Sequence, residues 1–251
     1  MSETLKGRVR AFWENEPCGT KTAAAAPGTA EFFAEVEQRR YELEPFIPSF
    51  AQFERWDGKD VLEVGVGLGT DFVRFVRAGA RASGIDLTEA AVALVRQRLE
   101  LEGRSAELRV GDAEALPFPD AAFDLVWSYG VLHHTPDTGG ALDEIRRVLR
   151  PSGEARVMLY ARHSWLGLGA WVRWGLLRGR PWRSIADVLA AHLESPGTKA
   201  YTEREIRQLF ADFSSVEIRR IVTPYDRRVA WKLADLTGPR LGWFFAITAR
   251  P

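Results

Sequence analysis

The chain has 251 residues, of which 46% are hydrophobic and 27% are charged. This length suits one large α/β domain, with or without a cap, and is sufficient to bury a core. Lys plus Arg and Asp plus Glu each number 34, so the zero net charge excludes an overall attraction for nucleic acid.

A single cysteine, Cys18, excludes an internal disulfide and a multi-cysteine zinc site. A reducing compartment such as the cytoplasm is therefore the expected location. Residues 1–16 mix charged and apolar positions, so we expect no signal peptide. We also expect no membrane-spanning helix, because no apolar run is long enough.

The N-terminal part, residues 1–57, is expected to form a helical cap. A helix is predicted over residues 30–44, where apolar side chains recur among charged ones until Pro45. The stretch before it, residues 21–30, is rich in Ala, Thr, Gly and Pro, which is typical of a flexible connection.

From residue 58 onward, short apolar runs alternate with amphipathic stretches. Strands are predicted over residues 60–65, 81–86, 106–110, 123–128 and 154–160. Helices are predicted over residues 69–78, 88–102 and 139–149. Strands that alternate with helices imply parallel β-α-β units and a doubly wound sheet.

The regular alternation breaks after the fifth strand. Residues 161–200 are rich in Trp, Gly and Arg and are predicted to be an insertion. The remaining predicted elements are a helix over 202–210, closing strands over 216–222 and 243–249, and a smaller insertion over 225–240 between these strands. We therefore expect an α/β fold with a seven-stranded sheet, in which residues 58–251 form one domain.

The first predicted strand runs into a turn with three glycines, Gly65, Gly67 and Gly69. Glycine lets the backbone turn sharply and approach a ligand closely. The pattern is close to a dinucleotide fingerprint, but its third glycine comes one residue too early for that class. Taken alone, the pattern is also compatible with a tight turn in any α/β protein.

Two acids follow at the ends of the next two strands. Asp86 ends the second strand, where a carboxylate can accept both hydroxyls of a ribose. Asp112 ends the third strand and can accept a hydrogen bond from an adenine amino group, while the N–H of Ala113 can reach a ring nitrogen. Either acid alone could be a helix cap or a loop residue. Together with the glycine turn, they indicate an adenosine-containing ligand at the carboxyl edge of the sheet.

Four motifs in this order resemble those of class I methyltransferases that use S-adenosylmethionine (SAM), especially the ubiquinone/menaquinone-biosynthesis type. They are V-L-E-V-G-V-G-L-G (61–69), G-D-A-E-A-L-P-F (111–118), F-D-L-V (123–126) and R-V-L-R-P-S-G (147–153). The resemblance weakens outside residues 58–160. It implies the Rossmann-like doubly wound sheet of that family and SAM as the cofactor.

The same resemblance implies roles for particular residues. Glu63 is expected near the methionine end of SAM, Leu87 near the adenine, and Ser128 and Tyr129 near the sulfonium. The implied cofactor-binding set is Glu63, Gly65, Gly67, Gly69, Asp86, Leu87, Asp112, Ala113, Ser128 and Tyr129.

Two histidines after the fourth strand, His133 and His134, are the first candidates for catalysis. SAM is a strong electrophile, but an O–H or acidic C–H acceptor also needs a general base, and histidine titrates near neutral pH. These histidines could instead only shape the cofactor pocket. Tyr160 and His163, at the end of the fifth strand, form a second catalytic set. No metal is expected, because adjacent histidines rarely converge on one ion and no further ligand cluster is evident.

The insertion carries an unusual local charge. Residues 161–183 contain five arginines, four tryptophans and no acid. The segment could be a lid whose arginines bind an anionic acceptor, a surface that touches a membrane interface, or simply structure packed on the core. These residues are Arg162, Arg173, Arg178, Arg180, Arg183, Trp165, Trp171, Trp174 and Trp182.

These features together predict an enzyme that transfers a methyl group from SAM to an O, N or C atom of a small anionic or aromatic molecule. A catalytically inactive SAM-binding regulatory protein and a methyltransferase that acts on a macromolecule are the alternatives. The neutral charge and the absence of an appended RNA-binding segment argue against nucleic acid as the partner.

Overall fold

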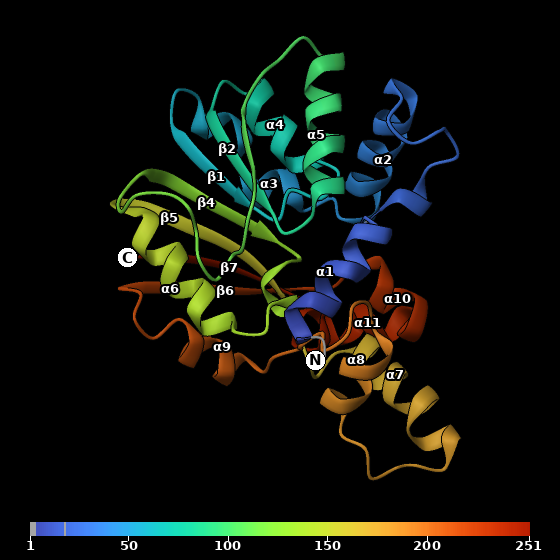
Figure 1. Ribbon diagram of the computed structural model, residues 1–251. Helices are drawn as coiled ribbons and strands as arrows, with labels where there is room; N and C mark the ends of the chain where they lie inside the picture. The colour runs from blue at the N-terminus through green and yellow to red at the C-terminus, as the bar shows by residue number, and fades with distance from the viewer. Residues whose placement is uncertain (1–3, 18) are drawn as a thin grey trace.

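A seven-stranded sheet forms the centre of the protein, in a computed structural model that describes residues 4–17 and 19–251 (Figure 1). The strand order is β3-β2-β1-β4-β5-β7-β6. The strands are β1 (Asp60–Val64), β2 (Arg81–Asp86), β3 (Glu107–Val110), β4 (Phe123–Tyr129), β5 (Leu149–Tyr160), β6 (Ser215–Ile221) and β7 (Phe244–Arg250). The first five pair in parallel, and β7 is antiparallel to β5 and β6. This topology confirms the predicted doubly wound α/β sheet.

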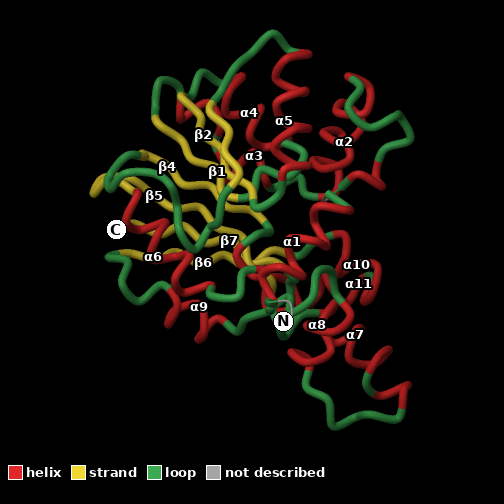
Figure 2. Tube along the Cα trace, viewed as in Figure 1, coloured by secondary structure: helices red, strands yellow, loops and turns green. Residues whose placement is uncertain are grey.

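Helices cover both faces of the sheet (Figure 2). One face carries α3 (Ile47–Ala51), η2 (Phe53–Trp56), α4 (Thr70–Arg77) and α5 (Glu89–Leu101), and the other carries α6 (Thr138–Val148) and α9 (Glu203–Leu209). Successive strand residues point to opposite faces, so Val61 packs in the first layer and Leu62 in the second. Both faces are therefore apolar at the centre of the sheet, where most residues of β4 and β5 are buried.

The N-terminal segment forms α1 (Leu5–Asn15), the short helix η1 (Thr20–Thr22) and α2 (Ala30–Leu43). The Thr29 side chain caps α2 by accepting from the N–H of Phe32. Phe50 and Phe53, from the predicted cap, belong to the same core as the sheet. The boundary at residue 57 stays a prediction, and Cys18 lies outside the described residues.

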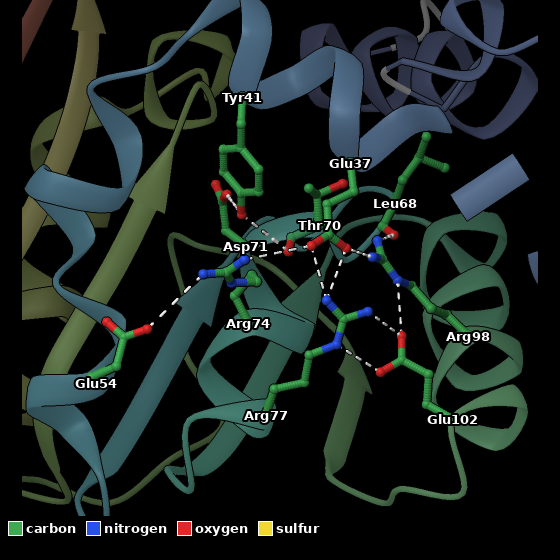
Figure 3. Close-up of polar contacts among 10 residues, drawn as sticks. All are labelled: Glu37, Tyr41, Glu54, Leu68, Thr70, Asp71, Arg74, Arg77, Arg98 and Glu102. Carbon is green, nitrogen blue, oxygen red and sulfur yellow. Dashed lines mark hydrogen bonds and ion pairs between the residues drawn. The ribbon is translucent and has the colours of Figure 1, made fainter. Parts of the chain in front are cut away.

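A network of charged side chains holds α2 against α4 and α5 (Figure 3). The buried guanidinium of Arg98 on α5 pairs with Glu37 on α2. Arg77 on α4 bonds to Glu37 at 2.9 Å and to Glu102 at 2.7 Å. Because α4 begins directly after the glycine turn, this network anchors the helix that the turn starts.

The two predicted insertions form helices that lie together beyond the end of the sheet (Figure 1). The first contains α7 (Trp165–Trp174), η4 (Leu176–Arg178) and α8 (Ile185–His192), and the second contains α10 (Pro224–Ala230), α11 (Lys232–Thr237) and η5 (Gly238–Leu241). Helix α7 packs against both α8 and α10. In the part of the chain that the structure describes, each helix is too short or too polar to cross a membrane.

Candidate functional site

A cavity of about 480 Å³ opens at the carboxyl ends of β1 to β4. Ten of the predicted site residues line it: Glu63, Gly65, Gly67, Asp86, Leu87, Asp112, Ala113, Tyr129, His134 and Tyr160. Among the described residues, the four predicted ones that do not line it are Gly69, Ser128, His133 and His163. Residues at or after the ends of five separate strands, β1 to β5, thus surround one volume.

The glycine turn contributes both a close backbone contact and a helix start. At Gly65, with φ of 83°, a β-carbon would lie 2.2 Å from a methyl group of Val131, so the loop after β4 can approach only a glycine. Gly69 is the N-cap of α4, and a β-carbon there would lie 2.9 Å from a methyl group of Val95 on α5. Gly69 therefore serves helix packing and not the cavity wall.

Glu63, at the end of β1, is a buried carboxylate at the cavity wall. Within the described residues, its Oε2 atom has no hydrogen-bond partner. Burial and the nearby charge of Asp71 raise the pKa of Glu63 well above its ordinary value, against the opposing effect of Arg40. A cation placed beside this carboxylate would offset that penalty.

Asp86, at the end of β2, is held in a fixed orientation. Its Oδ2 atom accepts from the N–H of Gly67 at 3.1 Å, and Oδ1 accepts from the N–H and hydroxyl of Thr88 at 3.0 and 2.7 Å. Burial raises the pKa of Asp86, and the bonds from Gly67 and Thr88 oppose this rise. A carboxylate oxygen has two acceptor positions, so Oδ2 can also accept from a ligand hydroxyl.

Helix α1 lies across the side of the cavity that holds Asp112. Lys6 bonds to Asp112 Oδ2 and to Glu114 Oε2, both at 2.5 Å. Val9 and Trp13 contribute to the cavity lining from the same helix. Asp112 therefore already holds a cation from α1, which local sequence patterns did not indicate.

A second polar contact fixes the other end of α1. The Glu14 carboxylate accepts from the backbone N–H groups of Glu89 and Ala90 at 3.1 and 3.0 Å, at the start of α5. An acid at this position also interacts favourably with the helix dipole. Helix α1 is thus tied to the loop after β3 at one end and to α5 at the other.

His134 is surrounded by polar partners from the segment after α8. Its Nδ1 atom lies 2.8 Å from the Ser195 hydroxyl and 3.1 Å from the Thr198 hydroxyl, and its Nε2 atom lies 3.2 Å from Glu194 Oε2. The Tyr160 hydroxyl donates to the same Glu194 oxygen at 3.0 Å. Glu194 also lines the cavity, so the insertion places a carboxylate where sequence reasoning identified only a histidine and a tyrosine.

Three other predicted site residues, His133, His163 and Ser128, do not line the cavity. His133 is fully buried, and its ring lies 3.8 Å from that of Tyr160. Burial, followed by the charge of His134, lowers the pKa of His133 well below its ordinary value, so it is neutral. His163 is exposed, and the Ser128 hydroxyl donates to the Val64 carbonyl at 3.1 Å, joining β4 to β1.

A metal ion is a further possibility for this cluster. One donor atom from each of His133, His134 and Glu194 lies within 4.8 Å of the others. We expected no metal because adjacent histidines rarely converge on one ion and no further ligand cluster was evident; Glu194 offers a carboxylate oxygen beside both histidines. Since His134 and Glu194 also bond to each other and to hydroxyls, their positions have an explanation without an ion.

The end of the cavity near Tyr160, where the sequence predicts the acceptor, has a mainly apolar lining, and we call it the acceptor end. Leu166 and Leu193 line it from the first insertion, and Tyr225 lines it from the second. Of the described residues, none of the five arginines and four tryptophans in 161–183 belongs to this lining. The arrangement therefore gives these arginines no contact with an anionic acceptor inside the cavity.

Residues 62–157 match the family model of a methyltransferase domain. Over these residues the chain is similar to a methyltransferase domain, and it shares its fold with a solved SAM-dependent methyltransferase from Aquifex aeolicus. The match covers the four motifs apart from Val61, and this likeness together with the fold implies SAM as the cofactor.

Curated relatives resemble mainly this domain. The chain is 40% identical over 109 residues to the ubiquinone/menaquinone biosynthesis C-methyltransferase UbiE of Dinoroseobacter shibae, covering 41% of this chain and 42% of that protein. It is 36% identical over 114 residues to the sterol 24-C-methyltransferase ERG6B of Gibberella zeae, covering 43% and 28%. The chain thus spans less than half the length of either relative.

The solved PH0226 protein from Pyrococcus horikoshii OT3 has the same fold as the whole chain. It aligns with a TM-score of 0.60 over 96% of this chain and 98% of its own, at 17% sequence identity. The fold extends well beyond the methyltransferase domain match, into the segments that bound the acceptor end.

Proposed function

We propose that the protein transfers a methyl group from SAM to a nucleophilic atom of a small, largely apolar molecule. The observation that carries the proposal is a single cavity lined both by Asp86 and Asp112 and by His134 and Glu194. Its volume, about 480 Å³, is typical of small-molecule sites. Bound SAM would supply the electrophilic methyl group, and the chain would align the acceptor and exclude water.

The residues at the cofactor end suit SAM. The unpartnered Oε2 of Glu63 would receive the ammonium of the methionine moiety, and the nearby guanidinium of Arg40 suits its carboxylate. A β-carbon at Gly67 would meet nothing within 4 Å, which leaves the backbone open to the ligand. Asp86 would hold the ribose, and Asp112 with Ala113 would bind the adenine.

The Glu194–His134 pair would accept the proton of the acceptor. With Nε2 protonated and facing Glu194, Nδ1 can accept from Ser195, and Tyr160 donates to the same carboxylate oxygen. Glu194 keeps a second oxygen for the acceptor proton. This arrangement favours acceptors with a removable proton, such as a hydroxyl or an acidic C–H.

A transfer assay tests the proposal. Purified protein is incubated with SAM carrying a labelled methyl group and with a panel of apolar alcohols, phenols and amines. We expect labelled product together with demethylated cofactor. Tight SAM binding in calorimetry without transfer to any panel member would contradict enzyme function and favour the regulatory SAM-binding alternative.

The same assay also tests whether the acceptor is a macromolecule. The acceptor end is bounded by Trp13 from α1 and by Leu166 and Leu193 from the first insertion, which suits a molecule that enters the cavity. Transfer of label only to added protein or RNA would contradict the small-molecule proposal.

A further inference from the structure

Exposed apolar side chains gather on the helices of the two insertions. Among the described residues, eight of the nine exposed large hydrophobic side chains lie in α7, α10, α11 or the segments that join them. They are Leu168, Leu176, Leu177, Trp182, Val229, Trp231, Leu233 and Leu236. Soluble monomers rarely concentrate exposed apolar surface in this way without a partner.

The two insertions form one continuous face, although they are far apart in the sequence. Gly169 on α7 lets α10 approach so closely that a β-carbon there would lie 2.7 Å from a methyl group of Val229. The indole N–H of Trp165 donates to the Thr237 hydroxyl at 2.9 Å and so joins α7 to α11. Figure 1 shows these helices projecting together from the sheet. We call α7–α8 with α10–α11 the projecting face.

The projecting face also carries cations. Arg173 and Arg178 lie over the ring of Trp174, at 4.9 and 5.2 Å, and Lys232 lies over Trp231 at 5.0 Å. Within the described residues, neither of these arginines has a carboxylate partner. Cations and aromatic rings therefore share the surface from which the apolar side chains extend.

This chemistry fits one partner, a bilayer with anionic lipids. Tryptophan, leucine and arginine together are typical of segments that lie in the membrane interface, where apolar side chains enter the acyl region and cations meet headgroups. A second copy of the chain fits less well, because a two-fold contact would bring the same arginines face to face.

The projecting face adjoins the acceptor end of the cavity. Leu166 at the start of α7, Leu193 after α8 and Tyr225 on α10 line the cavity, while Leu177 and Leu236 point to solvent with exposed fractions of 74% and 80%. We propose that the projecting face docks on an anionic lipid bilayer and that the acceptor, an amphiphilic lipid, enters the cavity from it. The entry of a lipid acceptor rests on the proposed function, whereas the docking on a bilayer does not.

Vesicle sedimentation tests the docking. The protein is mixed with vesicles of phosphatidylcholine alone or with added phosphatidylglycerol, at low and high salt. We expect sedimentation with the anionic vesicles only, weakened by salt. Leu177→Asp and Leu236→Asp should each lower the partition coefficient roughly tenfold or more, and Arg178→Gln roughly fivefold.

A matched control is Leu101→Asp, because Leu101 is 54% exposed on α5, outside the projecting face. It should bind vesicles like the wild type. Thermal unfolding and SAM titration on every variant confirm folding. The proposal is overturned if the wild type does not sediment with anionic vesicles, or if Leu101→Asp weakens binding as much as Leu177→Asp. A dimer that Leu177→Asp dissociates, without vesicle binding, would identify a second copy as the partner instead.

The same protein separates this inference from the proposed function. Vesicle binding is measured without SAM or acceptor, so docking without methyl transfer contradicts only the proposed function. Methyl transfer to a soluble acceptor without vesicle binding contradicts only the docking.

Discussion

The two ends of the cavity are assembled in different ways. At the cofactor end, Gly65, Asp86 and Asp112 each lie at or just after the end of a strand in the parallel part of the sheet. At the acceptor end, Leu166, Glu194 and Tyr225 come from helical segments outside that regular alternation. Local sequence patterns can therefore specify the first end, whereas the second depends on how distant segments pack. Variants at the two ends should accordingly separate cofactor binding from turnover.

The largest effect is expected at the acceptor end. Glu194→Gln and His134→Ala should each lower turnover by about 100-fold or more, because proton removal is lost, and leave SAM affinity nearly unchanged. The double variant should be little worse than either single one, since the two side chains act as a unit. Steady-state kinetics and calorimetry measure both quantities.

His163→Ala is the control for this pair, because His163 is exposed and outside the cavity lining. It should behave like the wild type. A parallel fall of SAM affinity and turnover in His134→Ala would make His134 a cofactor-pocket residue instead.

The next effect is expected at the cofactor end. Asp86→Ala should weaken SAM binding by about 1.5–3 kcal/mol, roughly 10- to 150-fold, since charge-assisted bonds to the ribose are lost. Asp120→Ala, at a side chain that is 78% exposed, is the matched control and should leave calorimetric affinity unchanged. Unaltered affinity in a folded Asp86→Ala protein would rule against the ribose assignment.

A smaller effect concerns pH. Because the pKa of free Glu63 is raised, the carboxyl is protonated at pH values where an ordinary glutamate is ionised. The ammonium of SAM favours the ionised form, so binding must release a proton below that pKa. SAM affinity should therefore rise with pH, by at most about tenfold per unit, and level off above the pKa of the free protein. Glu63→Gln should flatten this dependence in titrations at several pH values; an unchanged slope would contradict the assignment.

The smallest effect is expected from metal removal. If hydrogen bonds alone organise His134 and Glu194, dialysis against a chelator should leave methyl transfer unchanged. Metal analysis of the purified protein accompanies the assay. Activity that is lost with the chelator and restored by a divalent cation would make His133, His134 and Glu194 metal ligands.

The same contrast explains what could be predicted from the sequence. The strand ends before Gly65, Asp86 and Asp112 were predictable because apolar runs followed by turn residues are local signals. Glu194 was not, because it lies in a segment without a motif and reaches His134 only through tertiary packing. The first insertion was predicted from its composition and the second from its place between two predicted strands. The helices of the first were not predicted, since Trp, Gly and Arg there give no clear helical period.

One strand boundary was wrong for a related reason. The fifth strand was predicted from residue 154, after the turn signal Pro151-Ser152-Gly153, but β5 already begins at Leu149. Leu149 pairs with Phe123, and the register between β4 and β5 shifts before Leu125. The residues of the predicted turn thus belong to β5, next to an irregularity in its pairing with β4. Sequence patterns do not distinguish such an irregularity from a loop.

Helix α1 has a consequence for the rate at which spent cofactor is released. Its two attachments, Lys6 to Asp112 and Glu14 to the start of α5, are polar contacts in partly exposed positions. Because residues of α1 line the cavity, we expect spent cofactor to leave more easily when one of these attachments opens. Salt screens the Lys6 attachment and competes with charged contacts in general. We therefore expect the departure of spent cofactor to quicken as ionic strength rises, even where equilibrium affinity for it declines.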